Sequence, residues 1–200
     1  MSKEIILASG SENRRTLLTA LGVPFRVVPS EIDEDAIQIQ DPIKRVLEIA
    51  SVKAHTIGEK IGGLIIAADT FAVYNGRQYQ KPGNLDEARH MLQELSGKRG
   101  KSITGICILD SEIHEEVLDH RIVHVQCKML TPQEIEQYIQ TRPVTQWAAA
   151  YNPLDDLSSR IFKPVGHYTY KIEYYGLPID IVAESVRKIG FNVDLSKFRA

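Results

Sequence analysis

The most informative stretch of the sequence for the fold is Leu64-Ile65-Ile66-Ala67-Ala68-Asp69-Thr70. Its five consecutive apolar residues predict a buried strand. Asp69 follows that run directly, and in open α/β sheets ligands bind beyond the carboxyl ends of strands. A carboxylate there is suited to holding a metal or activating a water. Asp also forms turns after strands, so a structural role explains Asp69 equally well on its own.

Strands and helices alternate on both sides of this run. Asp41 and Pro42 form a helix start, Asn75-Gly76 predicts a hairpin turn, and Thr131 and Glu134 form a capping box. The predicted strands are residues 5–8, 25–29, 64–68, 71–74, 77–80, 103–109 and 115–129, and the predicted helices are 14–21, 41–61, 84–95, one from 131 and 180–189. This order predicts an α/β fold, a mixed sheet with helices on its faces. No linker marks a domain boundary within residues 1–200.

Composition limits the function classes. The chain has 200 residues, 43% hydrophobic and 25% charged, with a formal net charge of -2. The overall electrostatic field of the protein therefore attracts neither nucleic acid nor an anionic membrane. The apolar run at residues 5–8 is too brief for a signal sequence or a membrane span, so we expect a cytoplasmic protein. Cys107 and Cys127 lie in apolar runs outside any metal or redox motif and are expected to be buried free thiols.

The first candidate site is the turn Ser9-Gly10-Ser11, followed by Arg14 and Arg15. A glycine-bearing turn into a helix exposes backbone amides, and hydroxyl and guanidinium groups add further donors, so the segment could cradle a phosphate. The alternative is a strand-to-helix turn in which Ser11 caps the helix and the arginines are solvated. The segment alone favours this second interpretation.

The second candidate is Lys53. On a helical wheel it falls within the apolar arc of the helix that begins at Asp41. A lysine there either extends its charge to solvent or binds a ligand, and the two interpretations are evenly matched.

Two charged loops complete the candidate set. Glu31, Asp33, Glu34 and Asp35 form an acidic cluster, and Lys81 begins a cationic turn, Lys81-Pro82-Gly83. Either could be a solvated loop. Together they offer carboxylates for Mg²⁺ and cations for phosphate oxygens, which phosphoanhydride hydrolysis requires.

Other polar and aromatic residues receive no assigned function. His120 and His124 lie in a predicted strand, where four residues span roughly 13 Å, so they would not share one metal ion. Trp147 and the tyrosines from Tyr168 to Tyr175 are expected in the core or on the sheet surface, and Tyr151 could stack on a base.

These segments occur in the same order in a known family. Leu7-Ala8-Ser9-Gly10-Ser11 and Arg14 resemble its opening motif L-A-S-x-S-P-R-R. The match continues through Ile32-Asp33-Glu34, Lys53-Ala54, Ala68-Asp69-Thr70, Lys81-Pro82, Leu95-Ser96-Gly97, Thr104-Gly105 and Gly176-Leu177-Pro178. The ordered set, covering nearly the entire chain, resembles the Maf family of nucleoside triphosphate pyrophosphatases.

The resemblance implies two lobes around a central cleft, as in inosine triphosphatases, and a homodimer. It implies release of pyrophosphate from a nucleoside triphosphate with a divalent metal, Mg²⁺ or Mn²⁺, and a house-cleaning role, with a family association to septum formation. Asp69 would activate water and hold the metal with Glu34. The residues implied to contact the triphosphate are Ser9, Ser11, Arg14, Lys53 and Lys81.

The chain departs from the family at positions that separate pyrimidine enzymes from those resembling 7-methyl-GTP pyrophosphatases. These positions are Asn13, Thr70 and Leu154. Thr70 fits the pyrimidine type, for dTTP and UTP, whereas Asn13 and Leu154 fit neither. The family's A-G-A-Y-G-I-Q-G becomes Ala-Ala-Ala-Tyr-Asn-Pro-Leu-Asp at residues 148–155. Leu154 offers no hydrogen bond, so Asn152 or Asp155 would have to read the base edge instead.

Two other functions stay open. The departures at Asn13 and around Tyr151 suit a catalytically weak or inactive nucleotide-binding regulatory protein, which would bind nucleotides without turnover. An inosine triphosphatase shares the reaction class, but the opening motif does not favour it.

Overall fold

The computed structural model describes residues 3–167 and 176–198. The chain divides into two compact units, Met1–Thr70 with Thr104–Arg121 and Tyr168–Ala200 as unit 1, and Phe71–Ile103 with Ile122–His167 as unit 2. The predicted tyrosines from Tyr168 to Tyr175 lie outside the described residues.

The described strands form one seven-stranded mixed sheet in the order β2-β1-β3-β5-β6-β7, with β4 paired to β3. The predicted α/β class is confirmed. The strands are β1 (Ile5–Leu7), β2 (Arg26–Val27), β3 (Leu64–Tyr74), β4 (Arg77–Tyr79), β5 (Arg99–Asp110), β6 (Glu115–Cys127) and β7 (Phe162–Val165). β1 is parallel to β2 and β3, whereas β4 and β7 are antiparallel to their partners.

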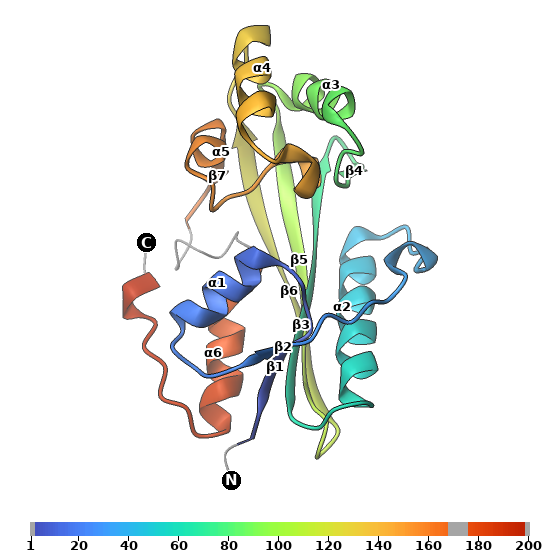
Figure 1. Ribbon diagram of the computed structural model, residues 1–200, viewed down its shortest axis with the longest axis vertical. Coiled ribbons are helices and arrows are strands. Elements are labelled where there is room, and N and C mark those ends of the chain that lie inside the picture. The colour runs from blue at the N-terminus through green and yellow to red at the C-terminus, as the bar shows by residue number, and fades with distance from the viewer. Residues whose placement is uncertain (1–2, 168–175, 199–200) are drawn as a thin grey trace. The chain divides into compact units, whose positions relative to one another are not determined.

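Helices cover both faces of the sheet in unit 1. α1 (Glu12–Ala20) and α6 (Ile179–Lys188) lie on one side and α2 (Pro42–Gly58) on the other, as Figure 1 shows. The core on the side of α1 and α6 includes Leu64, Ile66 and Ala68 of β3. The core on the side of α2 includes Ile65 and Ala67. Successive side chains of a strand point to opposite faces, so β3 contributes alternately to each core.

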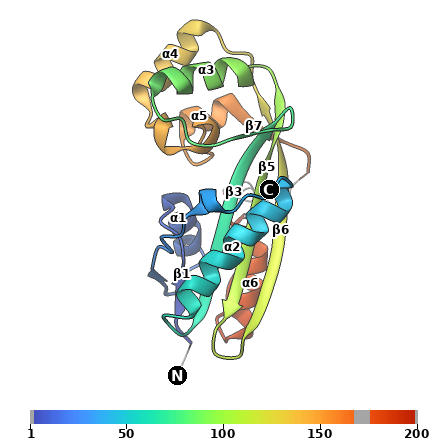
Figure 2. The same cartoon turned by 90° about the vertical axis from the view of Figure 1, so that its right-hand side faces the viewer.

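Unit 2 holds the remaining helices, α3 (Leu85–Leu95), α4 (Pro132–Thr141) and the short α5 (Asp156–Ile161). α3 and α4 lie side by side in both views (Figures 1 and 2). Arg89 of α3 joins them through an ion pair with Glu136 of α4.

Short 3-10 turns occur at Glu34–Ala36, Val144–Gln146, Ala148–Ala150 and Ser196–Phe198.

The predicted caps and turns are confirmed. The Asp41 carboxylate accepts hydrogen bonds from the backbone amides of Ile43 and Lys44. Asn84 caps α3, and Thr131 and Glu134 form the capping box of α4. Asn75 and Gly76 both have positive φ, 49° and 75°, as a tight hairpin turn between β3 and β4 requires.

Several boundaries differ from the predictions. β3 does not end at Ala68 but continues through Asp69 to Tyr74, because the hairpin that begins at Asn75 pairs its second half with β4. β2 is shortened to two residues between Pro24 and Pro29, since proline has no backbone N–H for a ladder. α2 ends at Gly58, three residues before the predicted end, and α5 and β7 lack a strong periodic signal and were not predicted.

Candidate active site

The site begins with Asp69 in the middle of β3. The placement beyond the end of a strand, expected from the sequence, is wrong, because the chain stays extended on both sides of Asp69. Alternation continues instead, so Asp69 extends the row of Ile65 and Ala67 toward α2, and Thr70 extends the opposite row toward α1 and α6. Two adjacent residues therefore serve opposite faces of the sheet in unit 1.

Lys53 comes to Asp69 from α2. Its ammonium Nζ lies 3.0 Å from Asp69 Oδ1 and 2.6 Å from Glu34 Oε1. The side chains of Lys53 and Asp69 are only 8% and 9% exposed, so Lys53 does not extend its charge to solvent. Asp69 Oδ2 is buried and has no hydrogen-bond partner within residues 3–167 and 176–198. A buried carboxylate oxygen without a partner is costly in a folded protein and suits a group that meets a ligand.

Glu34 is the member of the acidic cluster that reaches Lys53. It opens the 3-10 turn Glu34–Ala36, and its side chain is half exposed. Asp33 has a structural role, because its carboxylate accepts from the backbone amides of Asp35 and Ala36 and so caps this turn. The Asp35 carboxylate oxygen Oδ1 lies 3.9 Å from Arg45 Nη2, so Asp35 pairs with Arg45. The cluster therefore contributes one carboxylate to the Lys53 pair.

Arg14 of α1 is buried on the opposite face, and its predicted solvation is wrong. Its Nε donates to the carbonyl of Gly176 at 2.8 Å, Nη1 donates to Ser9 Oγ at 2.9 Å, and Nη2 donates to Thr70 Oγ1 at 3.2 Å. Burial lowers the pKa of Arg14 below its usual value, and the negative charges of Asp69 and Glu34 oppose that shift. Arg15 is exposed and pairs with Glu12, so Arg14 occupies the site alone.

The hydroxyl of Ser9 lies between two donors. Its Oγ accepts from Arg14 and, at 3.3 Å, from the backbone amide of Ser11. A hydroxyl oxygen accepts at most two such bonds, so the Ser9 hydrogen is left to donate to a ligand. Ser11 is the N-cap residue of α1 but makes no side-chain cap bond, and Asn13 is half-buried on that helix. Unit 1 thus gathers Ser9, Arg14, Glu34, Lys53, Asp69 and Thr70.

The other predicted site residues belong to unit 2. Lys81 is exposed, and so is Leu154, at 38%. Asn152 Oδ1 accepts from the backbone amide of Leu154, and Asp155 caps α5 and pairs with Arg142 at 2.7 Å. Both side chains therefore already have structural partners. The Tyr151 ring packs on Phe162 with centroids 4.5 Å apart, which places one of its faces in the core.

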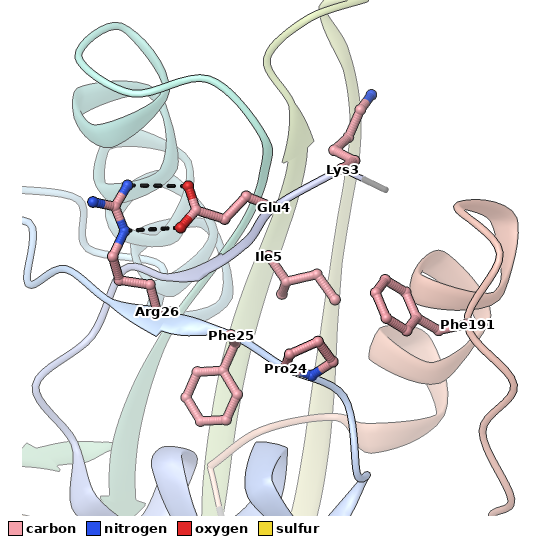
Figure 3. A pocket seen from close by; sticks show the side chains of 7 residues that line it. All are labelled: Lys3, Glu4, Ile5, Pro24, Phe25, Arg26 and Phe191. Carbon is pink, nitrogen blue, oxygen red and sulfur yellow. Dashed lines mark hydrogen bonds and ion pairs between the residues drawn. The ribbon is translucent and has the colours of Figure 1, made fainter. Parts of the chain in front are cut away.

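A hollow at the start of β1 has a different character. Its volume is about 360 Å³, and it is lined by Lys3, Glu4, Ile5, Pro24, Phe25, Arg26 and Phe191 (Figure 3). Glu4 pairs with Arg26, and Lys3 pairs with Asp110 and Glu112. Both cations of this hollow are already neutralised, so it does not offer an anion site comparable to that around Arg14.

The remaining sequence predictions concern the thiols, the histidines and the membrane. Cys107 and Cys127 are free and buried, and burial raises the pKa of each to about 12. His120 and His124 lie on β6 as predicted.

Within residues 3–167 and 176–198, no cluster of three His, Cys, Asp or Glu side chains is arranged to hold a metal. In the same ranges, no helix has the length and apolar character of a membrane span.

Fold and site together define an α/β protein in which a buried carboxylate–lysine pair and a guanidinium–hydroxyl cluster lie on opposite faces of one sheet. The model of the family described as "Maf-like protein" matches residues 4–189, and the chain belongs to this family. The resemblance in the sequence motifs is thereby confirmed.

Relatives and a solved structure agree with this assignment. The chain is 37% identical over 179 residues to a dTTP/UTP pyrophosphatase of Alkaliphilus oremlandii, covering 88% of this chain and 91% of the relative. It is 36% identical over 195 residues to a dTTP/UTP pyrophosphatase of Alkaliphilus metalliredigens, covering 96% and 99%. The structure of the Staphylococcus aureus Ham1 protein is 13% identical, with a TM-score of 0.54 over 93% of this chain and 99% of that chain, which supports the fold.

Proposed function

We propose that this protein hydrolyses a nucleoside triphosphate to the monophosphate and pyrophosphate. The observation that carries the proposal is the buried Asp69, whose Oδ1 accepts from Lys53 while Oδ2 has no partner in the part of the chain that the structure describes. One oxygen is fixed by the lysine, and the other is left to take a proton from a water aimed at the α–β linkage. Two relatives at 36% and 37% identity are named dTTP/UTP pyrophosphatases.

The other residues of unit 1 supply binding and orientation. Lys53 orients the Asp69 carboxylate, and its positive charge offsets the negative charge of the phosphates. Arg14 keeps Ser9 in place as a hydrogen-bond donor for a phosphate oxygen. Ser11 completes the proposed triphosphate contacts within unit 1, and Lys81 stays a predicted triphosphate contact.

The residues of unit 1 fit a divalent metal, Mg²⁺ or Mn²⁺. Magnesium is usually held in such enzymes by one or two carboxylates together with water and substrate phosphates, not by a cage of protein ligands. The carboxylates of Glu34 and Asp69 both contact the Lys53 ammonium, and Asp69 Oδ2 has no partner among the described residues. These two residues would hold the ion. When bound, it would neutralise phosphate charge and polarise the phosphoanhydride.

The proposed substrates are dTTP and UTP, with Asn13, Thr70 and Leu154 setting the choice of base. The relatives' names and Thr70 support this choice. Leu154 is apolar, and Asn152 and Asp155 have structural partners, so the loop at residues 152–155 favours looser selection of the base. The homodimer, the cytoplasmic location, the house-cleaning role and a link to septum formation stay predictions.

The test is pyrophosphate release from dTTP, UTP, CTP, ITP and 7-methyl-GTP with Mg²⁺ or Mn²⁺. Asp69→Asn should lower kcat about 10³-fold, because the amide cannot take the proton. Asp110→Asn is the matched control, since Asp110 is another buried carboxylate of unit 1 paired with a lysine, Lys3. Equal turnover by wild type and Asp69→Asn would refute the role of Asp69. Nucleotide-dependent thermal stabilisation without turnover in the wild type would instead indicate a nucleotide-binding regulatory protein.

A further inference from the structure

Thr104 is a buried polar residue next to the site that the proposed mechanism does not use. It lies in β5, only 2% exposed, and its hydroxyl Oγ1 is 3.0 Å from Thr70 Oγ1. Ile106 and Ile108 follow it on the face that packs toward α1 and α6, so alternation directs Thr104 to the face that carries Thr70 and Arg14. Thr70, Thr104 and Arg14 therefore form one hydrogen-bonded chain within unit 1.

Either threonine hydroxyl could donate in this pair, and a count of donors and acceptors favours one direction. Within the described residues, Thr70 is the hydrogen-bond partner of the Thr104 hydroxyl. A buried hydroxyl hydrogen requires an acceptor, so Thr104 donates to Thr70. Arg14 Nη2 donates to the same oxygen at 3.2 Å. Both acceptor positions of Thr70 Oγ1 are then filled, and its own hydrogen is the one group left for a ligand.

We propose that Thr104 is a positioning residue that, with Arg14, makes the Thr70 hydroxyl a donor only toward the nucleotide. The proposal rests on the proposed function. A donor-only hydroxyl accepts no hydrogen bond from an amino group, so it pairs with an acceptor oxygen on the substrate. That oxygen is either the 4-carbonyl of a uracil or thymine base, or an oxygen that cytosine nucleotides also carry, such as a phosphate oxygen, and the two sources give different results when UTP is replaced by CTP.

Ser9 provides a parallel on the same guanidinium. Arg14 Nη1 and the Ser11 amide fill its two acceptor positions, just as Arg14 Nη2 and Thr104 fill those of Thr70. Arg14 thus lies between two hydroxyls that are both set to donate. Thr104 does for Thr70 what the Ser11 backbone does for Ser9, and it does so with a side chain that can be changed without disturbing the main chain.

The experiment compares UTP with CTP, because CTP carries an amino group where UTP has the 4-carbonyl oxygen. Steady-state kcat and KM for both nucleotides would be measured for wild type, Thr104→Val and Thr104→Ser. Valine removes the hydroxyl at similar volume, and serine keeps it. Thr141→Val is the control, because the Thr141 hydroxyl donates to a main-chain carbonyl of its own helix in unit 2. Urea unfolding of each variant reports its folding, and Thr104→Ala replaces Thr104→Val if valine prevents folding.

If Thr70 donates to the 4-carbonyl of the base, Thr104→Val should lower the UTP to CTP ratio of kcat/KM about tenfold, the size of one neutral hydrogen bond. If Thr70 donates to an oxygen that both nucleotides carry, such as a phosphate oxygen, kcat/KM for both nucleotides should fall about tenfold at a constant ratio. Thr104→Ser should restore either loss. Wild-type values of kcat/KM for both nucleotides in Thr104→Val would overturn the proposal.

Failure of the proposed function can be distinguished from failure of this inference. If the wild type releases no pyrophosphate, the shift of Tm caused by UTP and by CTP replaces kinetics as the readout. A nucleotide-dependent shift that Thr104→Val reduces and Thr104→Ser restores supports the role of Thr104 in binding. Equal shifts in wild type and Thr104→Val refute it.

Discussion

The Lys53 ammonium lies 3.0 Å from the Asp69 carboxylate, and both side chains are buried between α2 and the sheet. Glu34 lies on the other side of the same ammonium, 2.6 Å away, but its side chain is half exposed. Lys53 is therefore the cation that pairs with this buried carboxylate inside unit 1, and under the proposed function both stability and catalysis should depend on the same contact.

Lys53→Met should lower the free energy of unfolding by about 3 kcal/mol, because it leaves Asp69 buried without its cation. Urea unfolding measures this change. Lys53→Met with Asp69→Leu should recover most of the loss, since no charge is then buried at the site. Lys60→Met, at an exposed lysine just beyond α2, is the control and should change stability by less than about 0.5 kcal/mol. Unchanged stability of Lys53→Met would show that the pair carries no net energy.

Gly105→Ala should move α2 and impair the site. A Cβ at Gly105 would lie 2.5 Å from the carbonyl oxygen of Val46, so the backbone of α2 packs directly on β5 there. We expect overpacking to lower the free energy of unfolding by about 2 kcal/mol. We also expect kcat to fall, because Lys53 lies further along the same helix.

Gly62→Ala is the matched control, since a Cβ there meets nothing within 4 Å. Its stability should stay the same or rise slightly. Urea unfolding and pyrophosphate release would be measured on both variants. Equal behaviour of Gly105→Ala and Gly62→Ala would contradict direct backbone packing at Gly105.

Local chemistry explains which parts of the fold were predictable. Asp41, Asn84, Thr131 and Asn75-Gly76 act through their own neighbouring backbone, so their caps and turn follow from sequence alone. The end of β3 does not, because pairing with β4 carries the strand through Asp69. Short elements such as β7 depend on a partner strand and give no periodic signal.

The candidate site follows the same division. Lys53 was detectable as a charge within an apolar arc. Its ion pairs with Glu34 and Asp69 explain how a lysine can be buried there. Arg14 lies three and four positions before Leu17 and Leu18, on the buried face of α1, which is a signal of the same kind. Its partners Thr70 and Gly176 are 56 and 162 positions away, so the sequence alone did not identify them. Thr104 was missed as a site residue for a similar reason. Its signals were its place within the predicted strand 103–109 and in the motif Thr104-Gly105, but its partner, Thr70, lies on the neighbouring strand.

Glu134→Gln should remove one component of the pH dependence of stability. The Lys128 ammonium and the amide and hydroxyl of Thr131 lower the pKa of Glu134 from 4.5 to about 2. A depressed carboxylate pKa stabilises the folded state above the unfolded pKa, and that contribution is lost as pH falls from about 4.5 toward 2. Wild type should therefore exceed Glu134→Gln in urea midpoint at neutral pH, and the difference should shrink below about pH 4.5. A difference constant from pH 7 to 3 would refute this assignment.

Ala149→Gly should stabilise the protein, although glycine usually weakens a fold. Ala149 has φ of 55° and Ala150 has φ of 54°, so two consecutive alanines occupy the left-handed region. A Cβ in that region costs about 1 to 2 kcal/mol, and glycine avoids the cost. Its greater freedom in the unfolded chain offsets part of the gain, so a net increase of about 0.5 to 1 kcal/mol in unfolding free energy is expected. Ala148→Gly is the control, because Ala148 lacks a positive φ and gains nothing from glycine. A destabilised Ala149→Gly would mean that the Ala149 methyl, which is buried, contributes more by packing than it costs in strain.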